Sequence, residues 1–232
     1  MEQKNNKILT IVAHPDDEVL GCGGMIAKYA KTNEIYIAIL GEGISARYEE
    51  REKAQKKEFL DLQEQSIKAG IFLGAQENLF FSFPDNQFDT VPFLKIVKKI
   101  EEIIKKIKPV VIYTHHNSDL NIDHRITFEA VLTATRPIDD CSVKELYSFE
   151  VPSSTEWSFQ KINNPFAPNV FEDISLTIDK KIKAIQIYDK EMRKFPHPRS
   201  KEAILAIAQT RGSTVGVKYA EAFELIRIIK TI

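Results

Sequence analysis

Residues that can do chemistry stand directly after an apolar run near the start of the chain. The run at 8–13 is followed at once by one imidazole and three carboxylates, in the order His14, Asp16, Asp17 and Glu18. A strand that ends at such residues places them at the carboxyl edge of a sheet, where open α/β folds bind ligands. Pro15 restrains the backbone between them. His14 and Asp17 can then point at one metal ion across a turn, with Asp16 facing another side of the same point.

A second polar segment completes this constellation. The apolar run at 109–113 leads into polar residues that extend to His124, just before a predicted helix. The imidazoles of His14 and His124 and the carboxylate of Asp17 are the ligand types of a catalytic zinc site with a fourth position open to water. Zinc would lower the pKa of that water to about 7 and polarise a carbonyl oxygen. Asp16 is then placed to accept the proton of the water as a general base.

The elements that must position these residues alternate between strands and helices. Strands are predicted at 8–13, 35–40, 71–73, 79–81, 109–113 and 146–151. Helices are predicted at 19–31, 45–69, 91–107, 125–135, 176–187 and 202–210, and 223–229 fits a strand or a helix. This alternation, with polar residues at the strand ends, indicates an α/β protein with a Rossmann-like, three-layer fold and a mostly parallel sheet.

Composition bounds the class of protein. At 232 residues with 43% hydrophobic content, we expect a single domain over 1–232, with the motifs in 7–137 and an extension of the same domain at 138–232. The 32 basic and 33 acidic residues nearly cancel, which argues against nucleic acid as a partner. The 2 cysteines, which lack CxxC spacing, fit a reducing compartment. With a polar start and no run long enough to cross a bilayer, we expect a cytoplasmic protein without stable membrane insertion.

Several stretches together resemble a known family. They are A-H-P-D-D-E followed by G-C-G-G, the G-E-G after the second predicted strand, and T-H-H-N-S-D-L-N-I-D-H-R-I-T after a later one. Over about residues 7–137 the chain is similar to the LmbE-like, or PIG-L, family of zinc-dependent N-deacetylases. The resemblance implies a Rossmann-like fold and removal of acetyl groups from N-acetylglucosamine units in lipid, thiol-precursor and polysaccharide pathways. By motif position it also implies that zinc is held by His14, Asp17 and His124, with Asp16 as the base.

One motif departs from the family pattern. Many members carry H-x-x-H, whose first histidine helps to stabilise the oxyanion or protonates the leaving amine, whereas this chain has Asn121 at that position. An asparagine amide can donate a hydrogen bond to an oxyanion, worth roughly 3 kcal/mol for one such donor, but it cannot transfer a proton. The proton must then come from Asp16 or from His116. Asp123, just before His124, is a candidate for orienting a metal ligand.

Candidate substrate contacts lie in loops near this site. Arg47 and Arg51 follow the Gly-Glu-Gly loop and can clamp a phosphate or carboxylate, although arginines at a helix start are also common on surfaces. Asp85 can bind sugar hydroxyls or simply belong to a turn. His197 lies in H-P-R-S, which resembles a C-terminal feature of a bacterial subgroup of the family, and it either lines the pocket mouth or precedes a helix that starts at Ser200.

These features predict a metal-dependent amide hydrolase that deacetylates an N-acetylated amino sugar or its conjugate. The expected cofactor is Zn²⁺, with Fe²⁺ as the alternative. The expected partner is the small-molecule substrate, and the sequence does not decide between a monomer and a homo-oligomer. Rival hypotheses are a catalytically silent sugar-binding member of the family, which Asn121 allows, and a metal-dependent hydrolase of another bond such as a phosphoester. A nucleotide-binding module is disfavoured, because Gly21, Gly23 and Gly24 do not form G-x-G-x-x-G.

Overall fold

The computed structural model describes residues 5–49, 56–138, 141–159, 164–188 and 190–230, which form a seven-stranded sheet in the order β3-β2-β1-β4-β5-β7-β6. The strands are β1 (Lys7–Val12), β2 (Glu34–Gly41), β3 (Glu77–Phe83), β4 (Val111–His115), β5 (Glu145–Phe149), β6 (Val170–Asp173) and β7 (Ala220–Ile228). Strands β1 to β5 pair in parallel, and β7 pairs antiparallel with β5 and β6. The predicted mostly parallel sheet is therefore confirmed.

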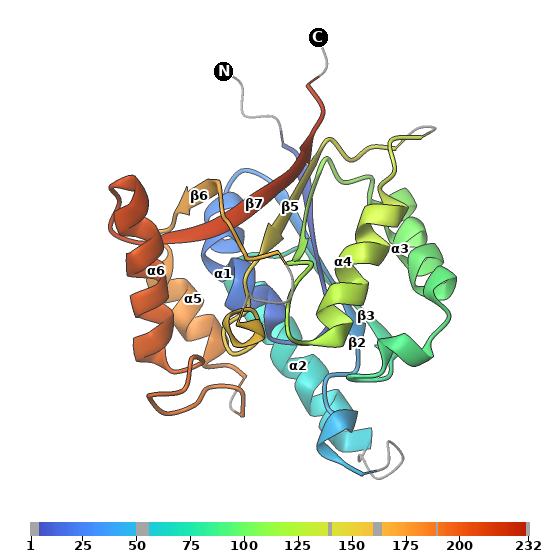
Figure 1. Cartoon of the computed structure of the whole chain (residues 1–232), viewed down its shortest axis with the longest axis horizontal. Coiled ribbons are helices and arrows are strands. Elements are labelled where there is room, and N and C mark those ends of the chain that lie inside the picture. Colours follow the sequence, from blue (N-terminus) through green and yellow to red (C-terminus); the bar gives the residue numbers. More distant parts are fainter. Residues whose placement is uncertain (1–4, 50–55, 139–140, 160–163, 189, 231–232) are drawn as a thin grey trace.

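Helices cover both faces of this sheet (Figure 1). They are α1 (Asp17–Tyr29), α2 (Lys56–Leu73), α3 (Phe93–Ile107), α4 (Ile122–Ala134), α5 (Ile178–Ile185) and α6 (Lys201–Val215), with 3-10 turns η1 (Ser45–Arg47), η3 (Phe88–Thr90) and η4 (Glu156–Ser158). Helices α1, α5 and α6 lie on one side of the sheet and α3 and α4 on the other, and α2 packs against α1 and α5. The fold is the predicted three-layer α/β arrangement.

The alternation of side chains along the strands fills two separate cores. In β1, Ile8 and Val12 pack into the core beneath α1, α2 and α5, whereas Leu9 and Ile11 face the core beneath α3 and α4. A strand buried on both faces favours a nearly continuous apolar run, and 8–13 is apolar except for the buried Thr10. Among the described residues, no helix combines the length and the apolar composition needed to cross a membrane.

The carboxyl ends of β1 and β4 lie side by side at the centre of the sheet. Strand β1 pairs with β2 on one edge and with β4 on the other. The chain leaves β1 into α1 on one face and leaves β4 into α4 on the opposite face. Such a topological switch point opens a ligand crevice in α/β sheets. The segments that follow β1 and β4 therefore meet there.

The structure corrects several predicted elements. Residues 71–73, predicted as a strand, are the end of α2, where Leu73 buries the same helix face as Ala69. The predicted helix over 45–69 is a 3-10 turn followed by α2, and 50–55 lie outside the described residues. Helix α4 begins at Ile122, so His124 lies within its first turn. Residues 223–228, for which a strand or a helix is predicted, belong to β7, which ends at Ile228. Strand β6 is absent from the predicted elements; three of its four residues are partly buried and Asp173 is exposed.

Close packing of α1 on the sheet requires a glycine at Gly21. A Cβ atom at this position would lie 2.3 Å from the ring of Phe149 in β5. Because no side chain stands between the helix backbone and that ring, α1 approaches the sheet closely and its first turn, with Asp17, is buried. The glycine-rich start of the helix thus contributes to packing.

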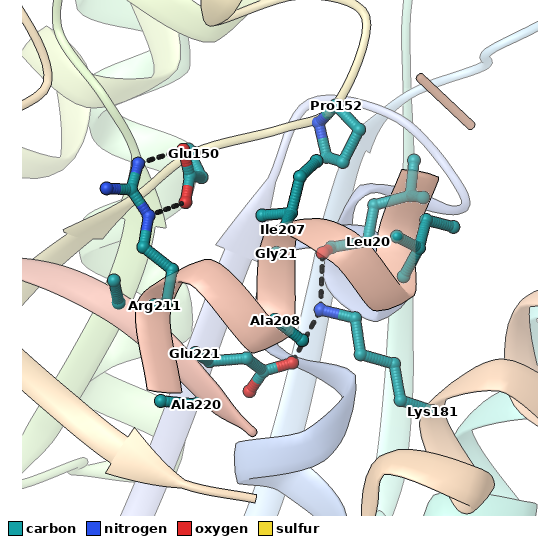
Figure 2. A pocket seen from close by; sticks show the side chains of 12 residues that line it. Leu20, Gly21, Glu150, Pro152, Lys181, Ile207, Ala208, Arg211, Ala220 and Glu221 are labelled. Atoms are coloured by element: carbon teal, nitrogen blue, oxygen red, sulfur yellow. Dashed lines mark hydrogen bonds and ion pairs between the residues drawn. The ribbon is translucent and has the colours of Figure 1, made fainter. Parts of the chain in front are cut away.

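A buried ion pair between Lys181 and Glu221, both in the C-terminal part of the chain, contacts the backbone of α1 (Figure 2). Nζ of Lys181 in α5 donates to the carbonyl oxygen of Leu20 at 2.7 Å and lies 2.6 Å from Oε1 of Glu221 in β7. Glu221 also accepts from the backbone N–H groups of Gly24 at 2.8 Å and Met25 at 2.7 Å. Lys181 and Glu221 are 6% and 4% exposed. Both charges are therefore paired and hydrogen-bonded, as burial requires.

Removing one member of this pair should destabilise the fold. We expect Lys181→Met to lower the free energy of unfolding by about 3–5 kcal/mol, because Glu221 would keep its buried charge without a counter-charge. Urea denaturation followed by circular dichroism measures the loss. The matched control is Lys183→Met on the exposed face of the same helix, which should stay within about 0.5 kcal/mol of the wild type. Equal unfolding midpoints for the two variants would contradict a stabilising role of the Lys181–Glu221 ion pair.

Candidate active site

A polar cavity of about 320 Å³ opens at the carboxyl ends of β1 and β4. Its lining residues come from the loop after β1, from the segments after β2, β3, β4 and β5, and from the segment before α6. The described residues that line it are His14, Pro15, Asp16, Asp17, Gly43, Ala46, Asp85, Asn86, Asn121, His124, Ser153, Ser154, Glu191 and Arg199. The crevice predicted from the strand ends is therefore present.

The structure brings His14, Asp17 and His124 together. One ligand atom from each lies within 4.8 Å of the others. Nε2 of His124 is 3.2 Å and Nδ1 of His14 is 3.5 Å from Oδ2 of Asp17. All three side chains are buried. Two imidazoles and a carboxylate converging on one point are the predicted arrangement for a metal ion.

The local backbone explains why these side chains converge. Asp17 is the first residue of α1, and its Oδ2 accepts the backbone N–H of His14 at 2.9 Å. Asp16 between them has φ 108°, a conformation that L side chains rarely adopt and that persists only when the surroundings hold it. Its N–H donates to Oε2 of Glu18 at 3.0 Å. The loop is therefore fixed in one tight turn.

Two further carboxylates orient the histidines. Oδ2 of Asp123 lies 2.9 Å from Nε2 of His14, and Asp123 also accepts the backbone N–H groups of Asn86 at 2.6 Å and Phe88 at 2.9 Å. Oδ1 of Asp119 lies 3.2 Å from Nδ1 of His124. A ring nitrogen held by a carboxylate leaves the other nitrogen to face a metal. The role predicted for Asp123 agrees with its contact with His14, and Asp119 makes a similar contact with His124.

The electrostatics of the centre favour a cation. Burial alone would lower the pKa of His124, but the charges of Asp17 and Asp119 raise it to about 9. Burial likewise opposes ionisation of Asp17, yet the neighbouring His124 and His115 hold the pKa of that carboxyl well below its usual range. Carboxylates outnumber permanent cations here, so positive charge is bound strongly. A metal ion would occupy the same field.

The residues present fit a metal ion. Oδ1 of Asp17 is buried and has no hydrogen-bond partner among the described residues. A buried carboxylate oxygen without a donor is costly, and a cation would satisfy it. Imidazole and carboxylate ligands suit zinc and ferrous iron. A further set of ligand atoms, from His14, Asp85 and Asp123, also lies within 4.8 Å and shares His14 with the first.

Arg199 is a site residue that sequence reasoning missed. Its Nη1 lies 2.7 Å from Oδ2 of Asp16 and its Nε donates to Oγ of Ser153 at 2.8 Å. Burial raises the pKa of Asp16, and the guanidinium offsets part of that rise. The H-P-R-S segment was noticed, but only the fold shows that its arginine, rather than His197, reaches the loop after β1.

Asn121 and Asp85 do more than the sequence suggested. Oδ1 of Asn121 accepts the N–H of Asp123 at 2.8 Å and so caps α4, while its Nδ2 donates to Oδ1 of Asn86 at 2.9 Å. Oδ1 of Asp85 lies 3.1 Å from Nε2 of His14, and its Oδ2 accepts the N–H of Ala46 at 3.2 Å. Both residues line the cavity, and their contacts with a substrate stay predictions.

Other predicted site residues lie elsewhere. The structure does not bring His116 to the cavity: its ring nitrogens lie 2.8 Å from Oε2 of Glu224 and 3.1 Å from the carbonyl oxygen of Asn164. His197 is not among the lining residues; its ring packs edge-on against Trp157, and its Nδ1 accepts the N–H of Arg199 at 3.0 Å. The side chain of Arg47 and all of Arg51 lie outside the described part of the chain.

His115 packs beside the metal-ligand candidates. The N–H of Ala13 donates to its Nε2 at 2.8 Å, so that nitrogen carries no proton when the bond is made. Its ring stacks on His124, with centroids 3.9 Å apart. Burial lowers the pKa of His115 well below the usual value, in keeping with a neutral ring. His115 therefore connects β1 to a metal-ligand candidate by packing.

Fold and site together define a mostly parallel α/β protein with a buried His/Asp group at its switch point that could hold a metal ion. The PIG-L family model, described as GlcNAc-PI de-N-acetylase, matches residues 9–135, and the chain belongs to this family. The family predicted from the motifs is thus confirmed. A relative from Escherichia coli (strain K12), named uncharacterized deacetylase YaiS, is 29% identical over 178 residues, which cover 74% of this chain and 83% of that protein.

Solved structures share the fold. N,N'-diacetylchitobiose deacetylase from Pyrococcus horikoshii matches with a TM-score of 0.75 at 20% identity, covering 97% of this chain and 85% of that one. GalB, the 4-carboxy-2-hydroxymuconate hydratase from Pseudomonas putida KT2440, matches with a TM-score of 0.74 at 21% identity, covering 98% and 99%. A fold that carries both a deacetylase and a hydratase does not by itself select the reaction.

Metal content tests the proposed ligand set. We expect His14→Ala to lose most of the metal bound by the wild type after loading with zinc and desalting, because one of three ligands is gone. Elemental analysis measures the ratio of metal to protein. His116→Gln, which changes a buried histidine outside the cavity, should keep the wild-type ratio if circular dichroism shows that it is folded. Equal metal content in the two variants would remove His14 from the ligand set.

Proposed function

We propose that this chain is a metal-dependent N-deacetylase that hydrolyses the acetamide of an N-acetylated amino sugar or its conjugate. The observation that carries the proposal is that His14, Asp17 and His124 offer ligand atoms within 4.8 Å of one another, beside Asp16 in one polar cavity. Membership of a de-N-acetylase family and the relative YaiS support amide hydrolysis over other uses of this fold.

Asp16 performs the proton transfers in this proposal. A metal ion held by His14, Asp17 and His124 would supply a Lewis acid for the amide carbonyl and a water of lowered pKa, with Zn²⁺ the preferred ion and Fe²⁺ the alternative. Asp16 accepts the proton of the attacking water. It then returns that proton to the amide nitrogen as the C–N bond breaks, so that acetate and a free amine are the products. His116 takes no part, because it does not reach the cavity.

Asn121 is the proposed donor to the oxyanion. The cap bond from the N–H of Asp123 to Oδ1 fixes the amide so that Nδ2 is the end that carries the donors. One N–H of Nδ2 is used by Asn86, and the amide has a second. We assign this second N–H to the oxygen that becomes negative when water attacks. An asparagine can fill this position because the proton transfer belongs to Asp16.

The lining of the cavity favours a sugar as substrate. Its apolar side chains among the described lining residues are those of Pro15 and Ala46, and the others offer hydrogen-bonding groups or are glycine. Such a surface suits a hydroxyl-rich ring better than a long acyl chain. Asp85 stays a proposed contact for a sugar hydroxyl. Because a solved relative is an N,N'-diacetylchitobiose deacetylase, N-acetylglucosamine and its disaccharide are the first substrates to assay.

Acetate release tests the reaction and its base. We expect the zinc- or iron-loaded protein to release acetate from an N-acetyl sugar, and Asp16→Asn to lower kcat by about 10²–10⁴-fold while keeping its metal, because an amide cannot accept the proton. The control, Asp89→Asn, changes an exposed aspartate and should match the wild type. Hydrolysis of a phosphoester alone, or sugar binding without acetate, would refute the deacetylase proposal. Full turnover by Asp16→Asn would refute the base.

The variant Asn121→Asp separates the two roles of this residue. The carboxylate can still accept the N–H of Asp123 and keep the helix cap, but it has no N–H for the oxyanion. The change also removes the bond from Nδ2 to Oδ1 of Asn86. We therefore expect the melting temperature to fall by no more than the loss of this one exposed bond, and kcat to fall by about 10²-fold. Thermal unfolding and acetate release under saturating substrate measure the two effects. A kcat equal to that of the wild type would confine Asn121 to capping.

A further inference from the structure

The guanidinium of Arg199 connects the C-terminal segment to the side chain of Asp16. Nη1 lies 2.7 Å from Oδ2 of Asp16. Among the described residues, no hydrogen bond engages the other carboxylate oxygen, Oδ1. Asp16 is buried, with 3% of its surface exposed. One oxygen is therefore held by the arginine and the other is left to act.

We propose that Arg199 is a positioning residue for hydrolysis: it holds Oδ2 of Asp16, so that Oδ1 is the oxygen that takes the proton of the attacking water. The inference rests on the proposed function and adds a residue that lies outside the segment matched by the family model, 9–135. Arg199 acts through Asp16 and transfers no proton itself.

The arginine is anchored along its whole length. Nε donates to Oγ of Ser153 at 2.8 Å and to the carbonyl oxygen of Pro152 at 3.3 Å. Its backbone N–H donates to Nδ1 of His197 at 3.0 Å. The next residue, Ser200, caps α6 through its side chain. Because these bonds hold the side chain and the backbone of Arg199, its guanidinium can set the position of the Asp16 carboxylate.

The loop itself leaves the side chain of Asp16 in need of such a holder. With φ 108°, the backbone of Asp16 is held by Glu18 through its N–H and by the N–H groups of Val19 and Leu20 through its carbonyl oxygen. Those bonds fix where the side chain starts but not how the carboxylate is turned. Among the described residues, Arg199 provides the one hydrogen bond to that carboxylate.

An arginine is required because two directions must be served at once. The planar guanidinium presents Nε to Ser153 and Nη1 to Asp16 in one rigid plane. A lysine ammonium is a single flexible point and cannot bridge both with fixed geometry. Glu191, 3.5 Å from the same Nη1, adds a further contact on the cavity wall. Charge alone is therefore insufficient for this role.

The test compares Arg199→Lys and Arg199→Ala with the wild type in the zinc-loaded full chain. We expect both to lower kcat for deacetylation of N,N'-diacetylchitobiose by about 10²-fold, as a misplaced group does, with KM changed by less than about threefold and the metal-to-protein ratio unchanged. Added guanidinium, well below denaturing concentration, should restore part of kcat in Arg199→Ala and nothing in Asp16→Asn. The control is Arg193→Ala, on the exposed part of the same segment, which should behave as the wild type.

The outcomes separate this inference from the proposed function. Acetate release by the wild type together with wild-type kcat in Arg199→Lys would overturn the positioning role and leave the deacetylase intact. A rise in KM or a loss of metal with unchanged kcat would also overturn it, since Arg199 would then serve substrate or fold. Absence of acetate release by the wild type would overturn the proposed function and this inference with it.

Discussion

The parallel pairing of β1 with β4 is the constraint on which the site depends. Ile8 to Thr10 lie beside Val111 to Tyr113 in register, so the two strands end at the same level of the sheet. The chain then departs to opposite faces, and the space between the departing segments is the cavity. His14 and Asp17 come from one segment and His124 from the other, although a long stretch of sequence separates them. A shift in this register would carry the ligands apart.

Burial is the second constraint, because it forces each carboxylate to find partners. Asp123 accepts the backbone N–H groups of Asn86 and Phe88 and lies 2.9 Å from the ring of His14. Asp119 accepts hydrogen bonds from Asn121, Ser154 and Thr155, and its Oδ1 lies 3.2 Å from Nδ1 of His124. Each such set fixes a loop at the same time as it orients a ligand. The contacts that stabilise these loops therefore also set the geometry of the metal-ligand candidates.

Much of this could be predicted from the sequence, and the limits have physical causes. The apolar runs at 8–13 and 109–113 predict two of the strands, β1 and β4. The polar residues that follow them include the three metal-ligand candidates, which the structure brings together. Local pattern does not tell whether 71–73 is a strand or the end of a helix, since a short apolar run suits both. Nor does it show that His116 points away or that Arg199 points in, because these contacts depend on the packing of distant segments.

The contact of the Lys181–Glu221 ion pair with the backbone of α1 limits how parts of such chains can be recombined. Leu20, Gly24 and Met25 lie within the span that the family model matches, yet their buried polar contacts come from Lys181 and Glu221 beyond it. The backbone of α1 therefore takes buried polar partners from the C-terminal part of the chain. In a hybrid, the motif-bearing part of this chain would be joined to the C-terminal part of another protein. Helix α1 would then lack its partners, unless the other protein carries a lysine and a glutamate at the positions of Lys181 and Glu221.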